Sequence, residues 1–539
     1  MQPFGKLGRY SFFAAIIILM LVSLLGLALS DWLVLPALLF GTLTLLGIGD
    51  LIQKKHSILR NYPVLGHMRF LFEGIRPEIR QYLIESDQDE EPFSREDRSI
   101  VYQRAKGEEG LRPFGTRHHV YAAGYQWMTH SISPKPVNGH DFRVTIGGPD
   151  CRQPYSASIY NISAMSFGSL SANAIAALNH GARMGGFAHD TGEGGISRYH
   201  RQGGGDLIYE IGSGYFGCRR ADGGFDADKF AIQAADPQVR MVELKLSQGA
   251  KPGHGGILPA AKISPEIAEA RGVPMGQDCA SPARHSAFTT PIELMQFISR
   301  MRQLAGGKPT GFKLCVGHRR EFMCVVKAML ETGITPDFIV VDGKEGGTGA
   351  APLEFSNHMG MPLVEGLSFV HNTLRGVGLR DRIRIGASGK LITSFDIARI
   401  LALGADWVNS ARGFMFAVGC IQAQVCHTNR CPVGVTTQDK LRQRALVVDD
   451  KKHRVANFHA NTLKSLAELT SAAGLTHPGD FLPHHLMLRE KDGVMITEKD
   501  IRPYMPEGFL LREEWDKFGY VERWQRARAN DFAPIDDGV

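Results

Sequence analysis

Three cysteines in the sequence GCIQAQVCHTNRCPVG have the spacing of metal ligands. Cys420, Cys426 and Cys431 follow the pattern C-x5-C-x4-C, and Pro432 comes directly after the last. Thiolates this close in sequence can converge on one iron–sulfur cluster. A zinc site usually has four ligands, so zinc would need His427 or another residue as the fourth. Three thiolates therefore favour a [3Fe-4S] cluster, and three unrelated core thiols are the remaining alternative.

Two glycine-containing motifs have the composition of phosphate-binding loops: ASGKL at 387–391 and SARGFM at 410–415. Glycine lets the backbone approach a ligand closely, and backbone amides together with a guanidinium bind phosphate well. With a cluster motif nearby, the loops indicate a phosphorylated redox cofactor such as FMN. No GxGxxG motif opens a βα unit, so no NAD-binding module is predicted. The expected phosphate ligands are Ser388, Gly389, Ala411, Arg412 and Gly413.

A third motif, ELKLSQGAKPGHGG, places cations and an amide three residues apart. Lys245, Gln248 and Lys251 lead into a glycine-rich turn, and Arg271 follows later in the chain. Converging cations and an amide would suit a dicarboxylate and the charge that develops on a flavin. A solvated basic loop is the alternative interpretation of lysines at this spacing.

These motifs follow strand-like runs that alternate with helical patterns. Such alternation indicates a parallel sheet, and eight runs predict a closed (β/α)8 TIM barrel, whose chemistry lies at the carboxyl ends of its strands. A doubly wound sheet is the alternative. The runs are SIYNIS (158–163), GGFAHD (185–190), LIYEIG (207–212), VELKLS (242–247), GFKLCV (311–316), DFIVVD (337–342), RIRIGA (382–387) and DWVNS (406–410). Helices are predicted at 171–183, 291–304, 321–331, 364–375 and 394–403.

Two details of this pattern are testable against a structure. Ser394 is the expected N-cap of the last predicted helix, and Gly404 lies just past its end. The segment 247–310, between the fourth and fifth strands, is long for a loop and helix. We therefore expect it to contribute to the substrate site.

The N-terminal region contains two uncharged apolar runs, Phe12 to Leu29 and Trp32 to Gly49, separated by Ser30-Asp31. Each has the length of about 17 to 25 residues that crosses a bilayer, and the second run disfavours a cleaved signal peptide. Basic residues flank the pair on both sides, which predicts a hairpin with both ends in the cytoplasm. The sequence thus predicts a multi-pass protein of the inner (cell) membrane, with its catalytic part facing the cytoplasm. A buried hairpin inside a soluble domain is the alternative.

Composition excludes several other classes of protein. The chain of 539 residues has 43% hydrophobic residues and a charge of +6 without a basic block, so nucleic acid is not the expected partner. Eight cysteines are too few for a disulfide framework, which indicates a reducing compartment. The five isolated ones are expected to be buried small hydrophobic side chains: Cys151, Cys218, Cys279, Cys315 and Cys324. The predicted divisions are a two-helix membrane anchor (1–55), an N-terminal cap region (56–150), an FMN-binding barrel with an iron–sulfur loop at 420–431 (151–440) and a C-terminal helical extension (441–539).

The ordered motifs resemble the synthase region of glutamate synthase, specifically the membrane-associated FMN-binding glutamate synthase family. The similarity covers about 60 to 480. Its matching runs are SAMSFGSLS (163–171), TGEGG (191–195), KLSQGAKPGHGGILP (245–259), GGTGAAP (346–352), ASGKL, NSARGFM and CPVGVTTQD (431–439). The positions that this resemblance places around FMN are Ala164, Met165, Ser166, Lys313, Gly347, Ser388, Gly389, Ala411, Arg412 and Gly413.

The resemblance implies an oxidoreductase acting on CH-NH2 groups (EC 1.4 class). Such an enzyme reduces 2-iminoglutarate, formed from 2-oxoglutarate and ammonia, to L-glutamate through FMN. Electrons would enter at the [3Fe-4S] cluster from an unidentified donor, either ferredoxin-like or a redox partner in the membrane. The implied catalytic residues are Lys251 and Gln248, the implied substrate-binding residues are Lys245, Gln248 and Arg271, and the implied cluster ligands are Cys420, Cys426 and Cys431.

Some features depart from the long members of this family. The chain begins Met1-Gln2-Pro3 rather than with the cysteine nucleophile of a glutaminase domain, so we expect no glutamine hydrolysis. Ile196 and His254 stand where acidic residues are common, which leaves the ammonia source open. Two further hypotheses are an FMN and iron–sulfur oxidoreductase that acts on another amino or keto acid, and a non-catalytic membrane electron-transfer subunit.

Overall fold

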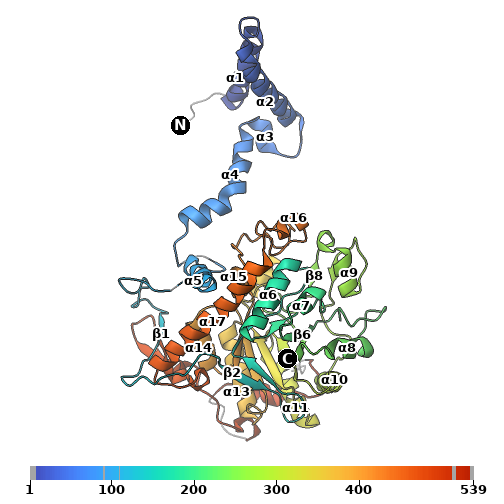
Figure 1. Cartoon of the computed structure of the whole chain (residues 1–539), viewed down its shortest axis with the longest axis vertical. Coiled ribbons are helices and arrows are strands. Elements are labelled where there is room, and N and C mark those ends of the chain that lie inside the picture. The colour runs from blue at the N-terminus through green and yellow to red at the C-terminus, as the bar shows by residue number, and fades with distance from the viewer. Residues whose placement is uncertain (1–7, 89–90, 109, 513–517, 534–539) are drawn as a thin grey trace, which may run out of the picture. The chain divides into compact units, whose positions relative to one another are not determined.

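The computed structural model describes residues 8–88, 91–108, 110–512 and 518–533. The chain forms two compact units, Met1–Pro92 and Phe93–Val539 (Figure 1).

The first unit contains two long apolar helices, α1 (Ser11–Gly26) and α2 (Val34–Ile52), which pack against each other. The segments Gly8–Gly26 and Asp31–Ile52 are long and apolar enough to cross a membrane, and only 17% of each is buried. This exposure argues against a hairpin buried inside a soluble domain. Two further helices, α3 (Ser57–Asn61) and α4 (Gly66–Ile79), complete the unit and lead into the π-helical turn η3 (Arg80–Ile84).

The second unit is built around a closed barrel of eight parallel strands. Each predicted strand-like run contributes one strand, which confirms the predicted TIM barrel and excludes the doubly wound sheet. β6 is buried at every position, as expected when helices cover the outside of a parallel sheet. In barrel order the strands are β4 (Tyr160–Ile162), β5 (His189–Asp190), β6 (Leu207–Ile211), β7 (Val239–Lys245), β10 (Thr310–Leu314), β11 (Phe338–Asp342), β12 (Arg384–Ser388) and β13 (Trp407–Ser410).

All five predicted helices are present, but one predicted cap is wrong. Thr393, and not Ser394, caps α14, because Asp396 stands three residues after Thr393 and completes a capping box. The Ser394 hydroxyl instead lies 2.8 Å from the Ser465 hydroxyl. The five helices are α6 (Ala172–Gly185), α10 (Pro291–Leu304), α11 (Arg319–Thr332), α13 (Leu363–Gly376) and α14 (Ser394–Ala402).

The helix α17 (Val448–Ala472) completes the outer ring. The helix that follows the last barrel strand, α15 (Arg412–Ala417), is short, whereas α17 packs against α6, α14 and α15. α5 (Arg95–Lys106) also packs on α17. Residues far apart in sequence therefore close the barrel where its first and last strands meet.

Smaller elements surround the barrel. Three short strands form an antiparallel sheet, β1 (Gln126–Met128), β14 (Leu486–Arg489) and β15 (Met495–Thr497), and β2 (Arg143–Ile146) pairs with β3 (Tyr155–Ser158). The β7–β10 segment holds β8 (Ile257–Leu258), η4 (Ala260–Lys262), α9 (Pro265–Arg271) and β9 (Cys279–Ala280). The remaining helices are α7 (Arg198–Gln202), α8 (Ala227–Ala234), α12 (Leu353–His358), α16 (Lys440–Gln443), α18 (Glu498–Ile501) and α19 (Val521–Arg526).

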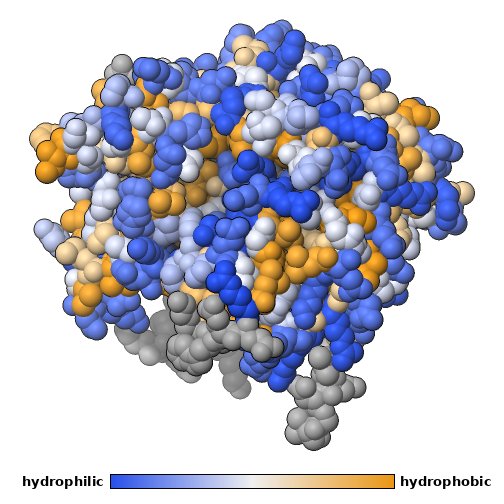
Figure 2. All heavy atoms as spheres, turned by 90° about the horizontal axis from the view of Figure 1, so that it is seen from below, coloured by the Kyte–Doolittle hydropathy of each residue, from blue (hydrophilic) through white to orange (hydrophobic). Residues whose placement is uncertain are grey.

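The apolar surface is unevenly distributed. On the face seen in Figure 2, hydrophilic side chains dominate and apolar ones gather in separate groups. By contrast, many large apolar side chains of α1 and α2 are exposed, such as Leu25 at 78% and Leu35 at 69%.

Candidate active site

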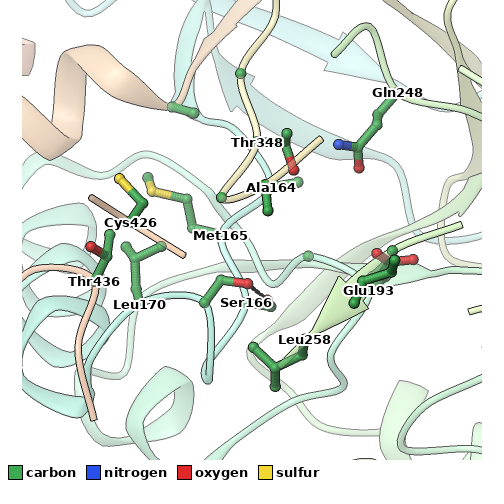
Figure 3. A pocket seen from close by; sticks show the side chains of 18 of the residues that line it. Ala164, Met165, Ser166, Leu170, Glu193, Gln248, Leu258, Thr348, Cys426 and Thr436 are labelled. Atoms are coloured by element: carbon green, nitrogen blue, oxygen red, sulfur yellow. Dashed lines mark hydrogen bonds between the residues drawn. The ribbon is translucent and has the colours of Figure 1, made fainter. Parts of the chain in front are cut away.

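The loops that follow the barrel strands surround one pocket. Residues after β4, β5, β7, β11 and β13 line it, and the β7–β10 segment supplies further residues, as expected from its length. In Figure 3, Cys426, Met165 and Thr436 lie toward one side, and Gln248 and Glu193 toward the other. Eleven predicted site residues line this pocket: Ala164, Met165, Ser166, Lys245, Gln248, Lys251, Arg271, Gly347, Ala411, Arg412 and Cys426.

A second, polar pocket adjoins the first. It brings together Lys313, Ser388 and Gly389 from the predicted set, and Ala164, Lys245, Gln248, Gly347, Ala411 and Arg412 line both pockets. The Ser388 hydroxyl donates to Asp342 over 2.5 Å. Among the described residues, Gly413 is a predicted site residue that lines neither of these two pockets. A Cβ at Gly413 would lie 2.7 Å from the Ser410 hydroxyl oxygen, so this glycine permits close packing behind the pocket wall.

The predicted lysines are buried in the pocket wall rather than solvated. The side chain of Lys245 is 11% exposed, and its Nζ lies 2.5 Å from Gln248 Oε1 and 3.1 Å from Glu193 Oε1. Lys251 is 4% exposed and donates to the Ala350 carbonyl over 3.0 Å. Burial and the charge of Lys245 lower the pKa of Lys251, and Glu193 opposes this shift.

Glu193 is a site residue that the sequence analysis missed. Burial would raise its pKa, but Lys245, Arg271 and Lys251 together lower it, so the carboxylate stays ionised. The available signal was its position, since Glu193 stands between glycines directly after a barrel strand in TGEGG.

Arg271 ends α9 with a buried guanidinium in the pocket lining. It lies 5.2 Å from the ring centroid of Phe216, and its Nη2 donates to the Ser166 hydroxyl over 3.4 Å. Among the described residues, its buried Nε–H has no hydrogen-bond partner. A buried N–H donor without an acceptor is costly, so a ligand that supplies an acceptor fits here.

Four charged side chains form a layer inside the barrel. The Lys313 ammonium forms an ion pair with Glu210, lies 2.9 Å from Glu243 and 3.8 Å from Asp190, and every member is at most 4% exposed. Burial alone would lower the pKa of Lys313, but the carboxylates raise it well above its usual value. We refer to these four residues as the barrel charge layer.

The barrel charge layer predicts a pH dependence of stability. Burial and Glu210 raise the pKa of Glu243 to about 7 from 4.5, although Lys313 opposes the shift. A carboxyl whose pKa is raised by folding stabilises the protein fully below 4.5 and loses that contribution as the pH rises through 7. We expect the melting temperature of the protein to fall between pH 5 and 8 and Glu243→Gln to remove part of this fall. Glu331→Gln, at an exposed position, is the control. Equal pH profiles for Glu243→Gln and the unchanged protein would contradict the assignment.

The three clustered cysteines follow α15 in one loop. Gln422, Gln424 and Asn429 in this loop adopt left-handed backbone conformations, with φ of 60°, 55° and 63°. A tetrahedral zinc site needs sulfur atoms about 3.8 Å apart. In the described part of the chain, no group of three candidate ligands that contains a cysteine has its ligand atoms within 4.8 Å of one another. The three thiols thus belong to one loop but do not all lie within 4.8 Å of one another.

Lys262 connects the cysteine loop to the pocket and was also missed from the sequence. Its ammonium donates to the Cys426 carbonyl over 3.2 Å and to the Ser169 carbonyl over 2.9 Å, and the residue is 3% exposed. It lines the pocket beside Arg271. No sequence pattern distinguished Lys262 from a surface lysine, because its neighbours become close only after folding.

Comparison with known proteins gives the family of this chain. Residues 152–476 match the model of the conserved region in glutamate synthase, which covers more than half of the chain. The chain belongs to the glutamate synthase family. The residues that match the glutamate synthase model span the whole barrel and the cysteine loop.

Curated relatives carry related names. Over 492 residues the chain is 40% identical to the glutamate synthase large subunit-like protein YerD of Bacillus subtilis, covering 84% of this chain and 93% of the relative. It is 34% identical to an archaeal-type glutamate synthase (NADPH) of Thermotoga neapolitana, over 58% of each chain. The glutamate synthase (NADPH) large chain of Bacillus subtilis is 32% identical, over 65% of this chain and 22% of that one.

Solved structures resemble this glutamate synthase family chain only distantly. A mutant flavocytochrome b2 with pyruvate bound covers 77% of this chain and 91% of its own, with 12% identity and a TM-score of 0.39. A mandelate oxidase mutant with (S)-mandelic acid covers 71% and 88%, with 13% identity and a TM-score of 0.40.

Proposed function

We propose that the chain is a glutamate synthase-type oxidoreductase that reduces 2-iminoglutarate, formed from 2-oxoglutarate and ammonia, to L-glutamate with FMN. The observation that carries this proposal is the pair of adjoining pockets. They bring the phosphate-type loops, the buried cations and one cysteine of the cluster motif to the carboxyl ends of the same barrel strands. Membership of the glutamate synthase family supports it.

The second pocket suits the phosphate end of FMN. Gly389 offers a backbone amide and Arg412 a guanidinium, and both groups donate to phosphate. Ser388 lines the same pocket, with its hydroxyl proton donated to Asp342. At Gly347 a Cβ would lie 2.6 Å from Arg412 Nε, so a side chain there would displace that guanidinium. When bound, FMN supplies hydride transfer, and the protein supplies position and charge.

The first pocket suits a dicarboxylate. Arg271 can donate its unpartnered Nε–H to one carboxylate, and Lys245 can offer charge to a second. Lys251 holds an ammonium where negative charge develops on the substrate or flavin, and in a buried site such a charge stabilises the transition state strongly. The ionised Glu193 can accept N–H bonds from ammonia or from the imine, and Gln248 orients the substrate.

Cys420, Cys426 and Cys431 are proposed to hold a [3Fe-4S] cluster. The C-x5-C-x4-C spacing of the three cysteines and the contribution of Cys426 to the pocket lining support this assignment. The cluster would supply one-electron chemistry, fed by a ferredoxin-like or membrane redox partner.

α1 and α2 are proposed to anchor the enzyme in the inner membrane. Arg9 before the hairpin and Lys54, Lys55 and Arg60 after it favour cytoplasmic ends, whereas the turn carries only Asp31. The barrel would then face the cytoplasm.

The decisive experiment uses the purified full chain under anaerobic conditions. We expect flavin absorption, bound iron, and glutamate formation when the reduced protein receives 2-oxoglutarate and ammonia. If the reduced protein makes no glutamate and a different amine reduces its oxidised flavin, the enzyme acts on another amino acid. A preparation that contains neither flavin nor iron would reject the whole proposal.

Replacing Cys426 by alanine tests the cluster. Cys426→Ala is expected to lose about three iron atoms per chain and the corresponding electron paramagnetic resonance signal, while flavin remains bound. Cys324→Ala, which removes a buried thiol on α11, is the matched control and should keep its iron. Retention of all iron by Cys426→Ala would contradict the ligand assignment.

Replacing Lys262 tests its position beside the cysteine loop. A buried cation favours the reduced, more negative cluster, so Lys262→Met is expected to lower the cluster midpoint potential by about 30 to 100 mV. Lys344→Met, whose ammonium donates to the Ser356 carbonyl over 2.7 Å, is the control. A redox titration followed by electron paramagnetic resonance measures the shift, and an unchanged potential would show that Lys262 has no electrostatic role.

A further inference from the structure

The segment after the two long helices carries an exposed apolar stripe. α4 and the π-helical turn η3 present apolar side chains at intervals of three and four residues, which is the period of one helix face. Most of these side chains are about half exposed, and Leu83 reaches 79%. The apolar stripe comprises Leu65, Met68, Leu71, Phe72, Ile75, Tyr82 and Leu83.

Arginines border this stripe along one edge. Arg69, Arg76 and Arg80 are seven and four residues apart, so they share one side of the helix. Arg69 pairs with Glu73 at 2.8 Å and Arg80 with Glu85 at 2.7 Å. From 54 to 84 the chain has six lysines and arginines against two acidic residues. The segment is therefore both amphipathic and basic.

Hydrogen bonds tie the start of α4 to the end of α2. Asp50, in the last turn of α2, is 4% exposed and accepts a hydrogen bond from the Val64 N–H over 2.9 Å. Its other oxygen lies 2.9 Å from His67 Nε2. If α2 crosses the bilayer, its end lies at the bilayer surface, and Asp50 holds the basic amphipathic segment at that surface.

We propose that α4 and η3 lie in the headgroup layer of an anionic phospholipid leaflet. The apolar stripe enters the acyl region, and the arginines reach the lipid phosphates, as amphipathic basic helices do at membranes. The excess of basic residues and the continuity with α2 favour lipid over a second copy of the chain. The inference rests on the membrane anchoring proposed above.

The test uses the full chain reconstituted in vesicles of phosphatidylcholine and phosphatidylglycerol. Leu71→benzoylphenylalanine places a photoreactive group on the apolar stripe. Glu73→benzoylphenylalanine, two residues later and about 200° around the helix, places it on the opposite side of α4. Leu45→benzoylphenylalanine in α2 reports the membrane anchor itself. Mass spectrometry after irradiation is expected to give lipid adducts at 45 and 71, with at least tenfold less at 73.

Each of the other possible adduct patterns contradicts one part of the proposal. Adducts from 71 to a peptide of the same chain or of a second copy overturn the lipid assignment, as does a lack of lipid adduct at 71 when 45 gives one. A lack of lipid adduct at 45 overturns the membrane anchor, and with it this inference. A variant that combines Arg69→Gln, Arg76→Gln and Arg80→Gln with benzoylphenylalanine at 71 should give at least threefold less lipid adduct at 71. If phosphatidylglycerol does not raise the yield at 71 in the protein that keeps all three arginines, the preference for anionic lipid is wrong.

Discussion

Replacing Lys313 by methionine is expected to lower the stability of the barrel by about 3 to 5 kcal/mol, because it leaves buried carboxylates without their counter-charge. Asp190, Glu210 and Glu243 surround the Lys313 ammonium, and each is 1% exposed. Thermal unfolding of the detergent-solubilised chain, followed by circular dichroism, measures the loss as a lower melting temperature.

The loss should depend on pH and on the partner carboxylates. Burial and Glu210 raise the pKa of Asp190 well above its usual value, so lowering the pH protonates the layer and should reduce the deficit of Lys313→Met. Adding Glu210→Gln should restore part of the stability. Lys229→Met, which removes an exposed ammonium 3.4 Å from Asp226, is the control and should change stability by less than about 0.5 kcal/mol. Unchanged melting of Lys313→Met at pH 8 would contradict this account.

Replacing Arg271 by lysine should weaken 2-oxoglutarate binding by about 100-fold, or about 2.8 kcal/mol. A guanidinium can bind a carboxylate through two parallel hydrogen bonds, whereas an ammonium cannot reproduce that geometry. Titration of the flavin spectrum with 2-oxoglutarate gives the dissociation constant directly. KM should rise by a similar factor, with a smaller change in kcat.

Arg198→Lys is the matched control for Arg271→Lys. Arg198 is an exposed arginine that binds Glu266 at 2.6 Å and lies outside the described linings of both pockets. It should therefore leave the dissociation constant unchanged. Equal affinities of Arg271→Lys and Arg198→Lys would show that Arg271 does not bind the substrate.

The barrel could be predicted because its strands are short apolar runs in a regular order. Motifs that directly follow a strand could also be assigned to one end of the barrel, because parallel strands in a closed barrel all end at the same edge. For this reason Lys245, Ser388 and Ala411 could be assigned to one region from the sequence. The long segment between β7 and β10 was recognised by its length alone.

The barrel charge layer could not be predicted in the same way. Glu210 is the only charged residue of β6, and Glu243 lies between the buried Val242 and Leu244 in β7. Only the register of β6 against β7 makes the two carboxyls neighbours. Lys313 comes from β10, on the other side of β7. A lone charge in a buried strand signals that a partner exists, but the identity of that partner depends on barrel closure and register. Lys262 was missed for a similar reason, because its two acceptors are backbone carbonyls without a sequence signature.

The location of Cys426 has a practical consequence for handling this protein. Its side chain borders the pocket, whereas Cys420 and Cys431 do not contribute to that described lining. Dissolved oxygen and thiol reagents that enter this pocket therefore meet Cys426 directly. A dicarboxylate in the pocket would block that route, so substrate should protect the protein against alkylation and aerobic inactivation during purification.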